Sequence, residues 1–178
     1  MKHSAAMQIR CLESLGDREL QGLSDVLMDC VENGASVSFM WPLTRATADA
    51  FWREVAVSMA RGERVLIVAE DTVRAIVGTV QVIWAQPENQ PHRGEVAKML
   101  VHPKARRQGV GAALLNAAEQ RALSAGRTLL VMDTASGDAE RLYARQGWQR
   151  VGVIPDYALW PRGGLCSTTI FFKALRGA

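Results

Sequence analysis

The sequence predicts an α/β (α+β) protein, built as a mixed, mostly antiparallel twisted sheet of about seven strands flanked by about four helices. Two observations predict this class. Three closely connected runs rich in β-branched residues fill the middle of the chain, and strand and helix patterns alternate after them. The chain has 178 residues, 48% hydrophobic and 22% charged, as in soluble globular domains. We therefore expect one domain over residues 1–178.

The first third of the chain predicts one strand and two helices. Residues 8–13 form a short strand pattern. An amphipathic helix is predicted over 17–32, where apolar residues recur every three or four positions and Asn33-Gly34 provides a stop signal. A second helix is predicted over 44–61, with Thr44 or Thr47 as its cap.

The remainder predicts a meander followed by alternating elements. Strands are predicted over 64–70, 75–84 and 94–101. The elements expected after them are a helix over 109–125, a strand over 127–133, a helix over 138–146, and strands over 148–154 and 167–173.

Composition excludes several function classes. The net charge of +3 does not require a nucleic acid partner, and no apolar stretch is long enough to cross a membrane. The three cysteines and three histidines lack metal-ligand spacing, so no metal is expected. The N-terminus lacks the apolar region of a signal peptide, which makes the cytoplasm the expected location.

The segment 101–111, Val-His-Pro-Lys-Ala-Arg-Arg-Gln-Gly-Val-Gly, carries the strongest chemical signal. It follows a strand and opens a helix, where backbone N–H groups lack intrahelical partners. Glycine lets a ligand approach those groups closely, and the helix dipole favours an anion. Lys104, Arg106 and Arg107 add three positive charges, equal to the whole surplus. A pyrophosphate pocket is predicted; the alternative is that the glycines only cap the helix.

Other phosphate motifs fit less well. A Walker loop would need Lys and Ser or Thr after Gly111, where Ala112 and Ala113 stand. A dinucleotide fingerprint would need a small residue where the chain has Leu114.

The pattern Val-x-Pro-x-x-Arg-x-x-Gly-x-Gly over 101–111 resembles the acetyl-coenzyme A motif of the GNAT N-acetyltransferases. Residues 139–148, Ala-Glu-Arg-Leu-Tyr-Ala-Arg-Gln-Gly-Trp, resemble the second motif of that family, with Trp148 in place of the usual Phe. The resemblance covers the whole chain, since the order of elements is also similar. It implies acetyl-CoA as co-substrate, bound by Met99, Leu100, Val101, Arg106, Arg107, Gln108, Gly109, Val110, Gly111, Ala112 and Ser136. Many relatives have Asn where this chain has Ser136.

A narrower resemblance points to the tabtoxin-resistance branch. It rests on segments 34–40, 95–99, 130–134 and 154–157. In that branch the acceptor is the amino group of a β-lactam amino acid toxin, which implies an amino-acid-like toxin or antibiotic as the acceptor here.

Three side chains are candidates for acetyl transfer. An amine with a pKa near 10 must lose a proton before it attacks a thioester, and Glu95 or Asp133 is the candidate base. Either acid can instead bind the substrate ammonium, or serve only as a strand or loop residue. The family motif places Tyr143 near the coenzyme A sulfur, as general acid. The expected oxyanion donor is the backbone N–H of Met99 or Leu100, where the family has a bulge.

The acceptor site is less determined. Phe39, Met40 and Trp41 make the connection between the first two helices unusually apolar, and the family builds an acceptor wall there; core packing is the alternative. Further candidates are Trp84, Asp156 and Tyr157. The cations available for an acceptor carboxylate are Lys98, Arg45 and Arg93, although Lys98 is expected on a solvated face.

Three functions remain open at this point. The first is N-acetylation of a small-molecule primary amine, the second is acetylation of a protein N-terminus or lysine, and the third is a regulatory module that binds acyl-CoA without catalysis. A closing loop over 35–42 would favour a small acceptor, whereas a short exposed loop would favour a peptide. A homodimer is possible, with the apolar final strand 169–172 pairing or packing across it.

Overall fold

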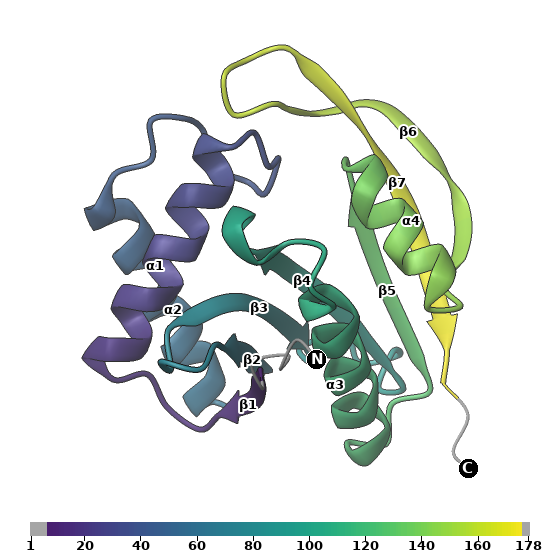
Figure 1. Cartoon of the computed structure of the whole chain (residues 1–178). Helices are drawn as coiled ribbons and strands as arrows, with labels where there is room; N and C mark the ends of the chain where they lie inside the picture. Colours follow the sequence, from purple (N-terminus) through teal and green to yellow (C-terminus); the bar gives the residue numbers. More distant parts are fainter. Residues whose placement is uncertain (1–6, 176–178) are drawn as a thin grey trace, which may run out of the picture.

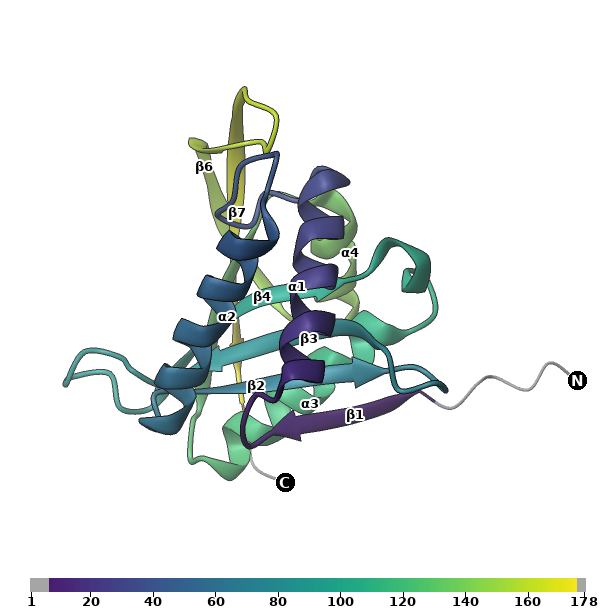
Figure 2. The same cartoon turned by 90° about the vertical axis from the view of Figure 1, so that its left-hand side faces the viewer.

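A single seven-stranded sheet organises the chain, with helices on both of its faces (Figures 1 and 2). The structure is a computed structural model and describes residues 7–175. The sheet order is β1-β2-β3-β4-β5-β7-β6. The strands are β1 (Gln8–Leu12), β2 (Arg64–Glu70), β3 (Ile76–Ile83), β4 (Arg93–Val101), β5 (Leu129–Thr134), β6 (Gln149–Leu159) and β7 (Leu165–Ala174). The helices are α1 (Asp17–Glu32), α2 (Arg45–Ala60), the short 3₁₀ turn η1 (Pro103–Ala105), α3 (Val110–Ser124) and α4 (Gly137–Arg145).

The predicted fold class is confirmed. Every pair of neighbouring strands is antiparallel except β4 and β5. Helices α1 and α2 cover one face of the sheet, and α3 covers the other (Figure 2). Each face therefore has its own apolar core, with Trp52 fully buried under α2 and Leu114 fully buried under α3. No helix of residues 7–175 is long and apolar enough to cross a membrane.

Helix ends follow the expected signals. The Thr44 hydroxyl accepts a hydrogen bond from the N–H of Thr47 at 3.2 Å, and therefore caps α2. Gly109 stands before α3 with φ of +82°, in the left-handed region that glycine adopts without steric cost. Ser136 accepts from the N–H of Ala139 at 3.4 Å and begins α4.

The final strands differ from the prediction. Strand β6 continues past residue 154 through a bulge, in which residues 155–157 stand opposite Ser167, and the hairpin closes only at 160–164. Strand β7 lies between β5 and β6, so both of its edges are already paired. The expectation that residues 169–172 pair across a dimer is therefore wrong, and the alternative that they pack across one stays a prediction. Several exposed apolar side chains lie on the edge strand β6, among them Val151 and Val153.

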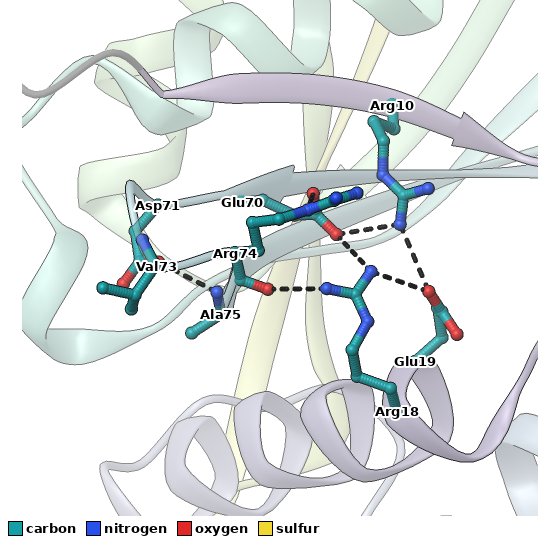
Figure 3. A network of polar contacts seen from close by, with 8 residues as sticks. All are labelled: Arg10, Arg18, Glu19, Glu70, Asp71, Val73, Arg74 and Ala75. Atoms are coloured by element: carbon teal, nitrogen blue, oxygen red, sulfur yellow. Dashed lines mark hydrogen bonds and ion pairs between the residues drawn. The ribbon is translucent and has the colours of Figure 1, made fainter.

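A buried carboxylate ties β1, β2 and α1 together (Figure 3). Glu70, at the end of β2, is fully buried and pairs with Arg10 at 2.8 Å and with Arg18 at 2.9 Å. Both guanidinium groups also contact Glu19, while Arg74 lies 3.8 Å from the far oxygen of Glu70. Because a buried carboxylate needs compensating charge, this cluster fixes where α1 begins relative to the sheet.

We expect Glu70→Ala to lower the free energy of unfolding by roughly 1–3 kcal/mol, below the usual cost for a buried pair because Arg10 and Arg18 can turn towards water. Urea unfolding measures the change. Arg74→Ala is the matched control: this arginine is 63% exposed, so its loss should cost less than about 0.5 kcal/mol. Equal losses in the two variants would contradict this view of the cluster.

Candidate active site

The gap between β4 and β5 is the centre of the candidate site. The two strands are parallel and pair only at Arg93, Gly94 and Glu95 of β4, after which they separate (Figure 1). In the described part of the chain, the β4 edge from Val96 onward has no β5 partner. The backbone N–H and C=O groups between Val96 and Leu100 that point away from β3 are thus open to an extended ligand, as on an edge strand.

A β-bulge shapes β4 within this gap. Leu100 pairs with Thr79 and Ala97 with Gln81, so Lys98 and Met99 together stand opposite Val80. Lys98 has φ of +48°, a strained value for a side chain other than glycine. The extra residue reverses the alternation of the strand: Met99 packs on the α3 face, and Leu100 packs on the α1 and α2 face.

The loop after β4 holds the residues of the predicted anion site. His102 caps the turn η1 by accepting from the N–H of Lys104 at 3.1 Å, and its other ring nitrogen lies 2.7 Å from Asp29 of α1. Arg106 donates to the Val101 carbonyl at 3.3 Å. Across residues 7–175, no acid pairs with Lys104, Arg106 or Arg107, and all three are exposed. Their charges are therefore available to a phosphate.

Two glycines at the start of α3 have different roles: Gly109 leaves the backbone open, and Gly111 allows close packing. A Cβ at Gly109 would meet nothing within 4 Å, so the backbone there lies open to a ligand. A Cβ at Gly111 would come within 2.8 Å of Leu142 in α4 and 3.2 Å of Met99 in β4. Glycine at this second position lets α3 approach both elements, and the N-terminus of α3 therefore stands beside the β4 bulge. The exposed side chain of Gln108 donates to the Lys104 carbonyl at 3.0 Å and closes this loop.

The candidate acids lie on the α1 and α2 face of the gap. Glu95 pairs in register with Val131, and Asp133 follows on the same face of β5. The Glu95 side chain is 47% exposed and lies 3.9 Å from Arg93. Asp133 accepts a hydrogen bond of 2.6 Å from the Thr168 hydroxyl of β7, which fixes the direction of the carboxylate.

Tyr143 occupies the other side of the gap. It is only 3% exposed and packs edge-on against Phe171, with ring centroids 5.6 Å apart. Burial raises the pKa of Tyr143 well above its ordinary value, and the nearby charge of Asp133 raises it further. The tyrosine therefore keeps its proton across the neutral range and can donate a hydrogen bond.

The predicted acceptor residues separate into three groups. Phe39, Met40 and Trp41 stand together in the loop between α1 and α2. Asp156 and Tyr157 lie in the exposed bulge of β6, where Asp156 has φ of +52°. Trp84 lies apart from both groups, because it packs with the α3 core and stacks with Arg127 at 5.4 Å.

The loop between α1 and α2 is tied to the turn between β6 and β7. The Trp41 N–H donates to the Pro161 carbonyl at 2.9 Å, and the Ser36 hydroxyl donates to the Leu159 carbonyl at 3.1 Å. The guanidinium of Arg162 lies 3.7 Å above the Trp41 ring. We call this joined pair of segments, residues 35–42 and 159–165, the arch.

A family model described as an acetyltransferase (GNAT) domain matches residues 61–150, half of the chain. The chain belongs to the GNAT acetyltransferase family. The matched region runs from the end of α2 to the start of β6, and so contains β4, the anion site and α4.

Solved structures of similar proteins share the GNAT fold. An N-acetyltransferase from Staphylococcus aureus Mu50 is 18% identical with a TM-score of 0.79, over 97% of this chain and 100% of that one. A phosphinothricin acetyltransferase from Sinorhizobium meliloti, solved in complex with acetyl-CoA, is 18% identical with a TM-score of 0.77, over 97% and 89%. A ribosomal-protein-alanine N-acetyltransferase from Brucella melitensis is 22% identical with a TM-score of 0.76, over 94% and 99%.

Several residues of this GNAT site had no clear signal in the sequence. Thr168 lies 35 positions from Asp133, and the arch joins residues more than a hundred positions apart, so no local pattern marks either contact. Lys98 was expected on a solvated face, yet it is half-buried. Two surface pockets, of about 330 and 200 Å³, lie against α2, and none of the candidate residues lines either pocket.

The raised pKa of Tyr143 can be tested directly, because the chain has only two tyrosines. In a Tyr157→Phe variant, Tyr143 is the only tyrosine left, and tyrosinate absorbance reports it alone. An ordinary tyrosine is half ionised near pH 10. Since burial and Asp133 both disfavour the tyrosinate, we expect no ionisation step at pH 10 while the fold persists, as followed by circular dichroism. A step near pH 10 in the folded protein would contradict the burial argument.

Proposed function

We propose that this GNAT protein transfers the acetyl group of acetyl-CoA to the primary amine of a small molecule. The arch is the observation that carries the choice of acceptor. A peptide needs an open groove beside β4, whereas here the loop from α1 is joined to the β6–β7 turn by two hydrogen bonds and a cation–π contact. Such closure supports a compact acceptor.

Acetyl-CoA fits the residues around β4 and α3. The pyrophosphate would be held by the N–H groups at the start of α3, from Gln108 to Ala112, with Arg106 and Arg107 supplying charge. The edge of β4 at Met99, Leu100 and Val101 has no β5 partner and suits an extended amide-bearing arm, which would share the Val101 carbonyl with Arg106. Ser136 caps α4 by accepting a hydrogen bond with its hydroxyl oxygen. We propose that the same side chain also contacts the co-substrate. When bound, acetyl-CoA supplies the acetyl group as a thioester.

The two acids have different proposed roles towards the amine of the acceptor. Glu95 is half-exposed and able to pass a proton to water, so we assign it as the base that deprotonates the ammonium. Asp133 is already held by Thr168, which suits it to orient the ammonium. The amine nitrogen then forms a bond to the acetyl carbon as the carbon–sulfur bond breaks, and the nitrogen loses its second proton to the departing thiolate through solvent, which leaves a neutral amide and coenzyme A.

Two groups stabilise the charges that develop. A backbone N–H at the β4 bulge, from Met99 or Leu100, donates to the carbonyl oxygen of the acetyl group. Tyr143 donates a hydrogen bond to the departing sulfur. Since its pKa lies above that of an ordinary thiol, about 8.5, the tyrosine stabilises the thiolate mainly as a hydrogen-bond donor.

Within this class, an amino-acid-like toxin or antibiotic is the acceptor that we favour. The resemblance of segments 34–40 and 154–157 to the tabtoxin-resistance branch supports it, and so does the similarity in fold to a phosphinothricin acetyltransferase.

A panel of acceptors tests the class. Thiol release from acetyl-CoA should give kcat/KM values at least ~10-fold higher for small primary amines and amino acids than for peptides, because a loss of about 1.4 kcal/mol in transition-state binding lowers kcat/KM tenfold. The peptides carry either a free N-terminus or a single lysine. Faster turnover of the peptides would favour a protein acceptor, and a chain that binds acetyl-CoA without any turnover would favour a regulatory module.

The pH dependence of the reaction rate should distinguish the role of Glu95 from that of Tyr143. Glu95→Gln removes the base and should lower kcat/KM by about 10²–10⁴-fold at pH 7, with the loss shrinking as the pH approaches the pKa of the amine. Tyr143→Phe should lower kcat at every pH, because the thiolate loses its donor whatever the state of the amine. Rate profiles against pH for both variants and for Asp133→Asn check this. If Asp133→Asn shows the shrinking loss and Glu95→Gln does not, the assignments of the two acids exchange.

A further inference from the structure

Lys98 is an ammonium group without a counter-ion beside the reacting centre. The β4 bulge turns its side chain towards the α1 and α2 face, the face that also carries Glu95 and Asp133. Its backbone, with φ of +48°, is strained, and such strain is concentrated at functional sites.

The surroundings of Lys98 are mostly apolar. Its ammonium donates to the Ser38 hydroxyl of the arch at 3.0 Å, and it lies 6.0 Å from the ring centre of Phe39 and 5.7 Å from that of Phe51. Throughout residues 7–175, no carboxylate lies within ion-pair distance of it. This half-buried ammonium therefore has a hydroxyl and two aromatic rings as neighbours and no opposite charge in direct contact within the described residues.

The charged groups around Lys98 act on its pKa in opposite directions. Burial lowers the pKa of Lys98, Arg64 lowers it further, and the more distant charges of Asp133 and Glu95 oppose the change. Of the other two cations expected for an acceptor anion, Arg45 pairs with Asp25, and Arg93 lies 3.9 Å from Glu95 and donates to Gln90 at 2.7 Å. Lys98 alone of the three faces the acids without a partner of opposite charge in the described part of the chain.

We propose that Lys98 binds the carboxylate, or an equivalent oxyanion, of the acceptor, so that the protein selects amines that carry an acid group. The inference rests on the proposed function and deepens it. Glu95 and Asp133 meet the ammonium end of such a molecule, Lys98 meets its anionic end, and the rings of Phe39 and Phe51 exclude water from the pair. One charge-assisted hydrogen bond contributes about 1.5–3 kcal/mol, roughly 10- to 100-fold in affinity.

Matched acceptors test the proposal. Phenylalanine is compared with phenethylamine, and lysine with cadaverine, since each pair differs by one carboxylate. In the wild-type protein we expect the acid to exceed its amine in kcat/KM. Lys98→Met keeps the length of the side chain and removes its charge, and should reduce the ratio of acid to amine by about 10- to 100-fold, mostly through KM. Lys98→Gln should give the same change of ratio.

Ser38→Ala is the control for a purely structural role. It removes the bond that joins Lys98 to the arch but leaves the charge in place. If Lys98 acted only by holding the arch, Ser38→Ala would reproduce the effect of Lys98→Met, and both would lower the melting temperature. We expect Ser38→Ala to keep the acid preference, and Lys98→Met to keep the wild-type melting temperature or exceed it, because a half-buried charge without an ion-pair partner is replaced by an apolar side chain of similar length.

Thermal shifts with the same pairs give a readout that does not need turnover. The acid should stabilise the wild-type protein more than its amine does, and Lys98→Met should abolish that difference. If no pair is acetylated but this acid-selective shift is found, the inference holds and the proposed function fails. If amines are acetylated without any preference for acids, the proposed function stands and the inference is overturned. Equal losses for both members of each pair in Lys98→Met also overturn it.

Discussion

The separation of β4 from β5 is the constraint on which the candidate site depends. Three residue pairs join the strands, and a fourth would close the edge that the co-substrate is proposed to use. The bulge at Lys98 and Met99 reinforces this separation, because it gives the strand one more residue than its partner and rotates the following side chains. The same irregularity therefore frees the backbone of β4, turns Lys98 towards the acceptor side and directs Met99 towards α3.

Elements on both faces of the sheet converge on this gap. From the α3 face come the glycine-opened helix start and Tyr143, which face the co-substrate in our proposal. From the α1 and α2 face come the arch and Lys98, which face the acceptor. Asp133 stands between the two halves, since its charge acts both on Tyr143 and on Lys98. Its hydrogen bond to Thr168 therefore matters on both sides of the reaction.

Local patterns predicted most of the fold, because periodicity and end signals report on neighbouring residues. The helix over 17–32 has the predicted bounds, Thr44 caps α2, and Gly109 precedes α3. The anion loop was predictable for the same reason, since its glycines and cations lie within one short segment. The roles of Glu95, Asp133 and Tyr143 came from a family resemblance, and they stay predictions until variants are assayed.

The predictions from sequence were wrong where contacts between distant segments determine the structure. The place of β7 inside the sheet follows from pairing with β5, 35 residues or more away, and sequence periodicity carries no such information. The environment of Lys98 depends on Phe39 and Phe51, which pack over the β4 bulge. The residues adjacent to Lys98 in the sequence predict neither its burial nor the bulge.

The insertion of β7 between β5 and β6 also bears on the order in which the protein can fold. Strand β5 is complete at residue 134, but its outer edge has no partner until residues 165–174 have been synthesised. A nascent chain on the ribosome thus carries an open strand edge through the synthesis of α4 and β6, the kind of edge that recruits other chains. Because β7 completes this part of the sheet, the half of the site that contains Asp133 and Thr168 can assemble only after residues 165–174 have left the ribosome.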